Sequence, residues 1–272
     1  MLKQFFIFFL LCTLLTACNT NQPETEKESA KTSNSPSEIQ EKSDIIVSAA
    51  ASLTDAAEEI KAAFNKEYPL ISVTYNFGSS GNLAQQIQQG APADVFLTAS
   101  KKDMDTLAKK DMIMEDTRRD FASNKLVVIS GKTNEFTLSA LKDITNANVN
   151  HIVLGDVKSV PAGRYAKESL ENVGVWEGIK DKMVYVSDVR QVLTQVETGN
   201  ADFGFVYNTD AIQSEDVDIN TKVDSSLHEP IIYPGAVIKA SKNKEAAKLY
   251  LDFLSSEEGK SILTSYGFIT NE

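Results

Sequence analysis

The sequence has almost no cysteine. Cys12 and Cys18 are its two cysteines, so the chain beyond them offers no disulfide, no thiolate nucleophile and no cysteine ligand for a metal. Histidine is equally scarce, and the spacing of His151 and His228 fits no zinc site. The GxSxG turn of hydrolases and the phosphate-binding GxxxxGK[ST] loop are both missing. These absences argue against an enzyme and against a bound cofactor.

Positive charge is also in short supply. Residues 44–272 carry 33 acidic and 23 basic residues, a formal net charge of −10. No basic stripe interrupts this excess, which argues against nucleic-acid binding. An anionic ligand would have to be held by local dipoles against an unfavourable overall field.

The N-terminal residues are typical of a targeting segment. The apolar run "FFIFFLLCTLL" is too short to span a bilayer, which takes about 20 apolar residues. It ends in "LTAC", where small residues precede Cys18, and this arrangement resembles a lipoprotein signal peptide. We expect a signal peptide over 1–17, then a lipid-modified Cys18 and a polar, disordered tether that together span 18–43. The alternative is an ordinary signal peptide followed by a chance cysteine.

From residue 44 onwards, strand-like apolar runs alternate with amphipathic helical runs. Strands are expected at 44–50, 70–77 and 93–99, each followed by a helix, and this order predicts a mostly parallel sheet covered on both faces. The pattern resumes at 124–130, and two helices end the chain after a strand broken by Pro230 and Pro234. We predict an α/β fold of two lobes, each a mixed, mostly parallel sheet flanked by helices, with a ligand cleft between the lobes. Lobe 1 is expected to be 44–121 plus 234–272, and lobe 2 to be 122–233.

Small or hydroxyl-bearing residues stand where predicted strands end and helices begin. The first junction offers Ser52, and the second offers the run Gly78, Ser79, Ser80 and Gly81. At the third, Pro161 leaves the N–H groups of Ala162 and Gly163 free; the fourth offers the N–H of Val189, and the fifth Tyr207. Ligands of parallel α/β folds bind at the carboxyl ends of strands, and helix N-termini present free N–H groups with a partial positive charge. Such donors suit a fully ionised oxyanion, because the proton of a protonated anion would find no acceptor. Each junction alone also has a structural interpretation; Ser52 with Asp55, for example, is a plausible capping pair.

Five segments carry a family resemblance, in order, across nearly all of residues 44–272. "AAASLTDA", "FGSSGNLAQQIQQGAPADVFLTAS", "VPAGRYAKESL", "DVRQVLTQVETGNADFGFVY" and "YPGAVI" together resemble the periplasmic molybdate-binding proteins of ABC transporters. The resemblance implies a periplasmic-binding-protein-like fold that closes on molybdate or tungstate. It further implies hydroxyl and backbone donors from Ser52 and Ser80, backbone N–H groups from Ala162 and Val189, and the phenol of Tyr207. The molybdenum would be held through its oxygens, with no direct metal ligand.

The expected partners follow from the resemblance. A binding protein tethered by lipid on Cys18 would sit on the extracytoplasmic face of the cell membrane, as a monomer, and deliver to a permease with an ATPase behind it. One alternative is a binding protein for another tetrahedral oxyanion such as sulfate or thiosulfate, a choice that depends on cavity size. A second alternative is a structural or adhesive surface lipoprotein, which would not need several donor-rich junctions.

Overall fold

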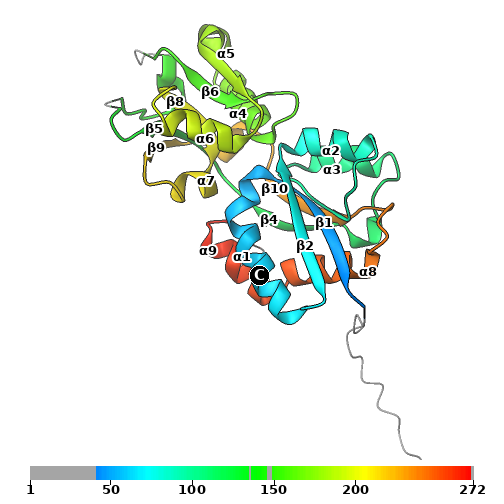
Figure 1. Ribbon diagram of the computed structural model, residues 1–272. Helices are drawn as coiled ribbons and strands as arrows, with labels where there is room; N and C mark the ends of the chain where they lie inside the picture. The colour runs from blue at the N-terminus through cyan, green and yellow to red at the C-terminus, as the bar shows by residue number, and fades with distance from the viewer. Residues whose placement is uncertain (1–40, 135, 146–148, 271–272) are drawn as a thin grey trace, which may run out of the picture. The chain divides into compact units, whose positions relative to one another are not determined.

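The computed structural model describes residues 41–134, 136–145 and 149–270. Most of the N-terminal predictions, including the signal peptide and the lipid on Cys18, lie outside these residues. The described strands form two five-stranded sheets with the orders β2-β1-β3-β10-β4 and β7-β6-β8-β5-β9 (Figure 1). The strands are β1 Ser43–Ala50, β2 Ile71–Gly78, β3 Val95–Leu97, β4 Arg119–Ser123, β5 Leu126–Gly131, β6 Ile152–Gly155, β7 Met183–Val186, β8 Phe203–Tyr207, β9 Val217–Lys222 and β10 Ile232–Val237.

Each sheet has the same mixture of strand directions. β1 pairs in parallel with β2 and β3, while β10 runs antiparallel to both β3 and β4. The second sheet repeats this plan, with β6 parallel to β7 and β8 and with β5 antiparallel to β8 and β9. Two successive antiparallel pairings restore the original direction, so only β10 and β5 oppose their neighbours. The mixed, mostly parallel sheets predicted from the sequence are confirmed.

Helices cover both faces of the first sheet. Along β3 the side chains alternate: Val95 and Leu97 pack with the core that includes α1 and α8, whereas Phe96 packs with the core that includes α2 and α3 (Figure 1). This period of two is what a strand buried on both faces requires. The helices are α1 Thr54–Glu67, α2 Ser80–Gln88, α3 Lys101–Ala108, α4 Pro161–Asn172, α5 Trp176–Ile179, α6 Val189–Glu197, α7 Asn208–Ile212, α8 Lys244–Leu254 and α9 Glu257–Ser265.

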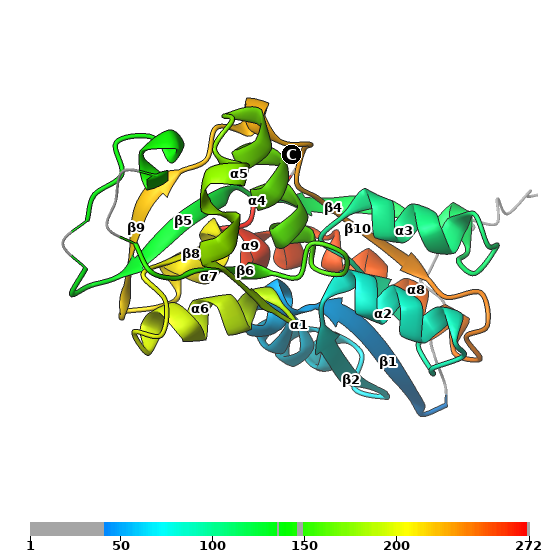
Figure 2. The same ribbon diagram turned by 90° about the horizontal axis from the view of Figure 1, so that it is seen from above.

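The second sheet is covered by α4 on one face and by α6 on the other (Figure 2). The chain enters this sheet between β4 and β5 and returns to the first between β9 and β10. The predicted lobe limits, at 121/122 and 233/234, fall inside β4 and β10. We call the part built on the first sheet the first lobe and the part built on the second sheet the second lobe.

The strand expected to break at Pro230 and Pro234 is continuous at the second proline. β10 lies between β3 and β4, and its register against β4 shifts between Tyr233 and Pro234. Such a bulge accommodates proline in a central strand because the ladder there needs no N–H. The carbonyl of Pro234 still accepts the N–H of Thr98 at 3.1 Å. Pro234 therefore bends the pairing of the strand without ending it.

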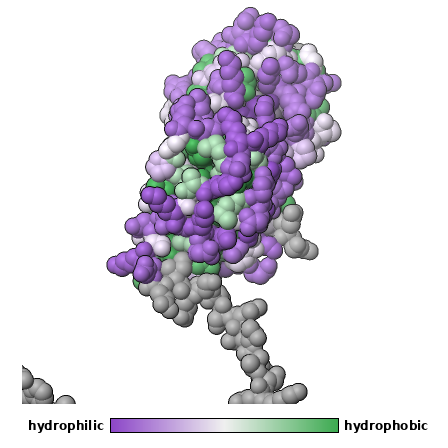
Figure 3. Space-filling model, turned by 90° about the vertical axis from the view of Figure 1, so that its right-hand side faces the viewer, coloured by the Kyte–Doolittle hydropathy of each residue, from purple (hydrophilic) through white to green (hydrophobic). Residues whose placement is uncertain are grey.

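The face of the molecule shown in Figure 3 is predominantly polar. Hydrophilic residues cover most of the face shown in Figure 3, and hydrophobic ones occupy a smaller area within it. Among the helices of the described residues, none combines the length and the apolar character that a membrane crossing needs.

Candidate functional site

The five residues that the family resemblance assigns to the ligand all line one cavity. It encloses about 210 Å³, the open mouth included. Ser52 lies in a short 3₁₀ turn directly after β1, and Ser80 begins α2; both belong to the first lobe. From the second lobe, Ala162 and Val189 lie in the first turns of α4 and α6, and Tyr207 ends β8. The junctions of the two sheets therefore meet at one point.

Backbone donors at this cavity are free because helices begin there. The first N–H groups of an α-helix have no acceptor within the helix. Pro161 occupies the first position of α4, where its missing N–H costs nothing, so Ala162 carries the first available N–H of that helix. The N–H of Val189 opens α6 in the same way, and Asp188 caps that helix by accepting the N–H of Gln191 at 3.0 Å. The partial positive charge of each helix terminus therefore faces the cavity.

Two buried hydroxyls at the cavity have no hydrogen-bond partner within the described part of the chain. These are Ser79 Oγ and Tyr207 Oη. Burial raises the pKa of Tyr207 well above its usual range, so the phenol stays protonated and can donate. An unsatisfied buried hydroxyl is costly, and a ligand that accepts hydrogen bonds here would remove that cost. Ser79 belongs to the second junction named from the sequence, but the family resemblance assigns ligand contact there to Ser80 and not to Ser79.

No charged side chain is among the residues that line the cavity. Two arginines lie in the first turns of the helices that border it, but both reach carboxylates of the first lobe. Arg190 of α6 contacts Asp55 of α1 at 2.9 Å, and Arg164 of α4 contacts Asp103 of α3 at 2.5 Å. The second pair is largely buried, and burial raises the pKa of Asp103 despite the attraction of Arg164. These pairs join the lobes on either side of the cavity.

Asp210 is a fully buried carboxyl one helical turn beyond Tyr207. Its Oδ2 accepts the N–H of Tyr207 at 3.2 Å, and its Oδ1 lies 3.8 Å from Arg190 Nη1. Burial raises the pKa of Asp210 to about 7, although Arg190 and the Tyr207 N–H pull it the other way. Asp210 therefore titrates in the neutral range, directly behind a residue of the cavity.

The expected capping role of Ser52 is wrong. Neither the 3₁₀ turn nor α1 has a side-chain cap, and Ser52 Oγ instead lies 2.8 Å from Tyr233 Oη. Asp55, its expected capping partner, pairs with Arg190 across the cleft. The local sequence pattern assigns the Ser52 hydroxyl to the helix start that follows it, but its partner is Tyr233, which is distant in sequence.

Gly81 allows the two lobes to approach closely beside the cavity. Its N–H donates to the carbonyl of Ser159 in the second lobe at 2.9 Å. A Cβ at this position would lie 2.6 Å from that same carbonyl oxygen, which is closer than real Cβ contacts allow. Glycine is required here for the approach of two backbones.

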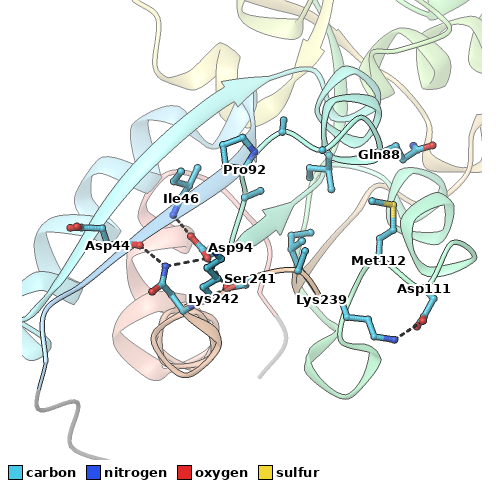
Figure 4. A pocket seen from close by; sticks show the side chains of 17 residues that line it. Asp44, Ile46, Gln88, Pro92, Asp94, Asp111, Met112, Lys239, Ser241 and Lys242 are labelled. Atoms are coloured by element: carbon cyan, nitrogen blue, oxygen red, sulfur yellow. Dashed lines mark hydrogen bonds and ion pairs between the residues drawn. The ribbon is translucent and has the colours of Figure 1, made fainter.

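A larger hollow lies at the opposite ends of the strands. It holds about 1370 Å³, open space included, and is bordered by the start of β1 and the end of β10 (Figure 4). Its polar groups pair with one another: Ser241 Oγ donates to Asp94 at 2.6 Å, and Lys239 contacts Asp111 at 2.5 Å. The charged side chains of Asp44 and Lys242 also line this hollow, whereas no charged side chain lines the smaller cavity.

The described residues contain no group of three or more histidine, cysteine or acidic side chains placed to hold a metal ion. The site offers hydroxyl and N–H donors from two lobes. A two-lobed α/β fold with a donor-lined cavity between the lobes is the arrangement expected of a solute-binding protein. The comparisons with known proteins agree: the profile of the family described as "Bacterial extracellular solute-binding protein" matches residues 45–269.

The chain belongs to this family, and within it to the group that contains ModA. It is 37% identical, over 98% of its length and 99% of the other, to YvgL of Bacillus subtilis, which is provisionally named a substrate-binding lipoprotein of an ABC transporter. It is also 37% identical to the molybdate-binding protein ModA of Escherichia coli, over 82% of this chain and 88% of ModA. A solved substrate-binding domain from Clostridium difficile, provisionally assigned to a molybdenum ABC transporter, is 41% identical with a TM-score of 0.66, over 85% of this chain and all of that domain.

Family membership confirms three expectations. The chain is a solute-binding protein of an ABC import system, its lobes have the periplasmic-binding-protein fold, and it is not an enzyme.

Proposed function

We propose that this protein captures molybdate, and tungstate by the same geometry, for import by an ABC transporter. The observation that carries the proposal is the cavity itself. Helix starts from both lobes present hydroxyl and N–H donors to it, and no charged side chain is among its lining residues. Molybdate is a tetrahedral dianion whose four oxygens accept hydrogen bonds. A cavity of donors matches it, with the helix termini supplying partial positive charge.

The roles of the five residues follow from their positions. Ser52 and Ser80 would contribute hydroxyl and backbone donors from the first lobe. Ala162 and Val189 would contribute backbone N–H groups, and Tyr207 its phenol, from the second lobe. Because the donors come from both lobes, the anion would hold the lobes together, and release would require them to separate. The contacts of Arg190 and Arg164 with the first lobe would support the closed state.

Molybdate is proposed ahead of sulfate because of the named relatives. The Escherichia coli relative whose name states its ligand binds molybdate, and its similarity extends across both lobes. Sulfate has the same shape and charge, so donors alone do not separate the two anions. The size of the closed cavity would make that choice.

The delivery route follows from the same proposal. A monomer with lipid on Cys18 and a tether up to residue 43 would remain on the extracytoplasmic face of the cell membrane. From there it would pass the anion to a permease driven by an ATPase. The similarity to YvgL, which covers almost the whole chain including this segment, supports the lipoprotein form.

The test is a calorimetric titration of the purified protein with molybdate. Ser80→Ala should weaken binding at least about tenfold, because a hydrogen bond to a charged group contributes about 1.5–3 kcal/mol. The double variant Ser52→Ala with Ser80→Ala should weaken it at least about 100-fold. It should remain folded, with a lower unfolding midpoint because the Ala99 N–H and the Tyr233 hydroxyl lose buried partners. Ser72→Ala, at an exposed position of β2, is the matched control and should bind like wild type. Undiminished affinity in the double variant would refute the site.

A further inference from the structure

Behind Ser52 runs a buried chain of polar groups that does not line the cavity. Ser52 Oγ lies 2.8 Å from Tyr233 Oη. Tyr233 Oη accepts from Asn124 Nδ2 at 3.4 Å, and the same nitrogen donates to Thr209 Oγ1 at 2.9 Å. Tyr233 is 0% exposed and Asn124 8% exposed. The chain thus connects a cavity residue to the places where the polypeptide crosses between lobes, since Asn124 follows β4 and Tyr233 lies in β10.

The direction of this chain is fixed at its far end. The backbone N–H of Lys125 donates to Asn124 Oδ1 at 2.8 Å, which identifies that atom as the oxygen and leaves Nδ2 as a pure donor. Tyr233 Oη therefore accepts from Asn124, and Ser52 Oγ, 2.8 Å away, is the acceptor within reach of the Tyr233 proton. Burial raises the pKa of Tyr233 well above its usual range, so this proton is retained. With its oxygen accepting from behind, Ser52 has its own proton left for the cavity.

Ser80 has the same arrangement with a different partner. Its Oγ accepts the backbone N–H of Ala99 at 3.0 Å, and the residue is 0% exposed. The hydroxyl oxygen of each serine therefore accepts a hydrogen bond on the side away from the cavity, and its own proton is available to a ligand in the cavity. The partner of Ser80 is a backbone group, whereas the partner of Ser52 is a side chain. Only the latter can be removed by substitution.

We propose that Tyr233 and Asn124 are positioning residues that fix the Ser52 hydroxyl as a donor toward the bound oxyanion. The inference rests on the proposed function and deepens it, because it states why a serine in this cavity donates when it could also accept. A hydroxyl free to rotate could accept the proton of a hydrogen phosphate. When Tyr233 donates to one lone pair of Ser52 Oγ, the serine proton is the group directed at the cavity. An anion oxygen that accepts this proton gains a hydrogen bond, whereas an OH group of the anion does not, so this chain would contribute to the selection of fully ionised anions.

The test is a double-mutant cycle between Tyr233 and Ser52, read by molybdate titration. Tyr233→Phe should weaken molybdate binding about tenfold. In a Ser52→Ala background the same substitution should change the affinity by less than about twofold, because its effect passes through Ser52. Tyr250→Phe is the matched control: Tyr250 is equally buried in the first lobe, and its hydroxyl lies 2.8 Å from Tyr75 Oη. It should leave the affinity unchanged.

A second variant tests the direction of the chain. Asn124→Asp keeps an oxygen for the Lys125 N–H but replaces the donor to Tyr233 by an acceptor. Relative to wild type at the same pH, a comparison that removes the contribution of Asp210, molybdate affinity should fall at pH 8 and recover toward pH 5.5, as the buried carboxyl takes up a proton and donates again. In the Ser52→Ala background this recovery should disappear. This variant decides the question if Tyr233→Phe does not fold.

The possible failures are distinguishable. If wild type binds neither molybdate nor tungstate, the proposed function fails and the inference fails with it. If wild type binds but Tyr233→Phe binds equally well, only the inference is overturned. An equal loss from Tyr233→Phe with and without Ser52 would also overturn it, because Tyr233 would then act on the fold and not through the serine.

Discussion

The buried carboxyl of Asp210 should make the second lobe less stable as pH rises, and the substitution Asp210→Asn should remove this dependence. Its pKa rises from an ordinary value of 3.8 to about 7 in the folded protein, chiefly through burial. Between these values the unfolded chain has lost the proton that the folded protein keeps, so stability falls as pH rises from about 4 to about 7 and is level above that. Asp210→Asn has no charge to bury, and its amide oxygen can still accept the N–H of Tyr207.

The magnitude follows from the two pKa values. The rise corresponds to about 4 kcal/mol in full, of which about 2.5 kcal/mol develops between pH 5 and pH 8. The variant should therefore gain about 2.5 kcal/mol relative to wild type over that range. Urea unfolding followed by the fluorescence of Trp176, the single tryptophan and part of the same lobe, measures this difference.

The control is Asp218→Asn, which changes an exposed carboxyl on β9 of the same sheet. Its stability relative to wild type should not change between pH 5 and pH 8. A difference between Asp210→Asn and wild type that is constant with pH, or that grows toward acid, would refute the reasoning. A constant difference would mean that Arg190 and the Tyr207 N–H offset the cost of burying the Asp210 carboxylate. A difference that grows toward acid would mean that they outweigh this cost.

Two further substitutions test the donors and the close approach of the lobes. Val189→Pro deletes one N–H at the first position of α6, where proline fits a helix, so molybdate affinity should fall about tenfold or more while the thermal midpoint barely moves. Calorimetric titration measures the affinity, and a melting curve measures the thermal midpoint. A clearly lowered midpoint would show that α6 does not tolerate proline at position 189. Gly81→Ala places a Cβ against the Ser159 carbonyl of the other lobe, so binding should weaken about tenfold with each lobe intact. Small-angle scattering should then show less compaction with molybdate than wild type does, and equal compaction would contradict the account.

The sequence is informative where periodicity is strong and local. The apolar face of α1 and the buried apolar run of β1 are recognisable from their periodicity. Ligands bind at the carboxyl ends of strands, so the order of the elements predicts which junctions face the ligand. β4 and β9 have no such signal. β9 is a mostly polar strand at the edge of its sheet, and only its pairing with β5 makes it a strand.

The contacts that define the site chemistry are long-range. Ser52 meets Tyr233 across 181 residues, and Arg190 meets Asp55 across 135. A local pattern assigns Ser52 and Asp55 to the same helix start, as a capping pair. Folding gives both of them distant partners. Tyr233 lies in β10, which joins the first sheet after the chain has passed through the second lobe, and Arg190 belongs to the second lobe. Sequence periodicity carries no record of such pairings.

One calorimetric series tests most directly whether this protein binds molybdate and tungstate in preference to other tetrahedral oxyanions. The protein would be titrated with molybdate, tungstate, sulfate and phosphate at the same pH and ionic strength. We expect saturable heat at a single site with molybdate and tungstate, and none with phosphate, whose proton would find no acceptor in the cavity. Saturable heat with sulfate and none with molybdate or tungstate would contradict it.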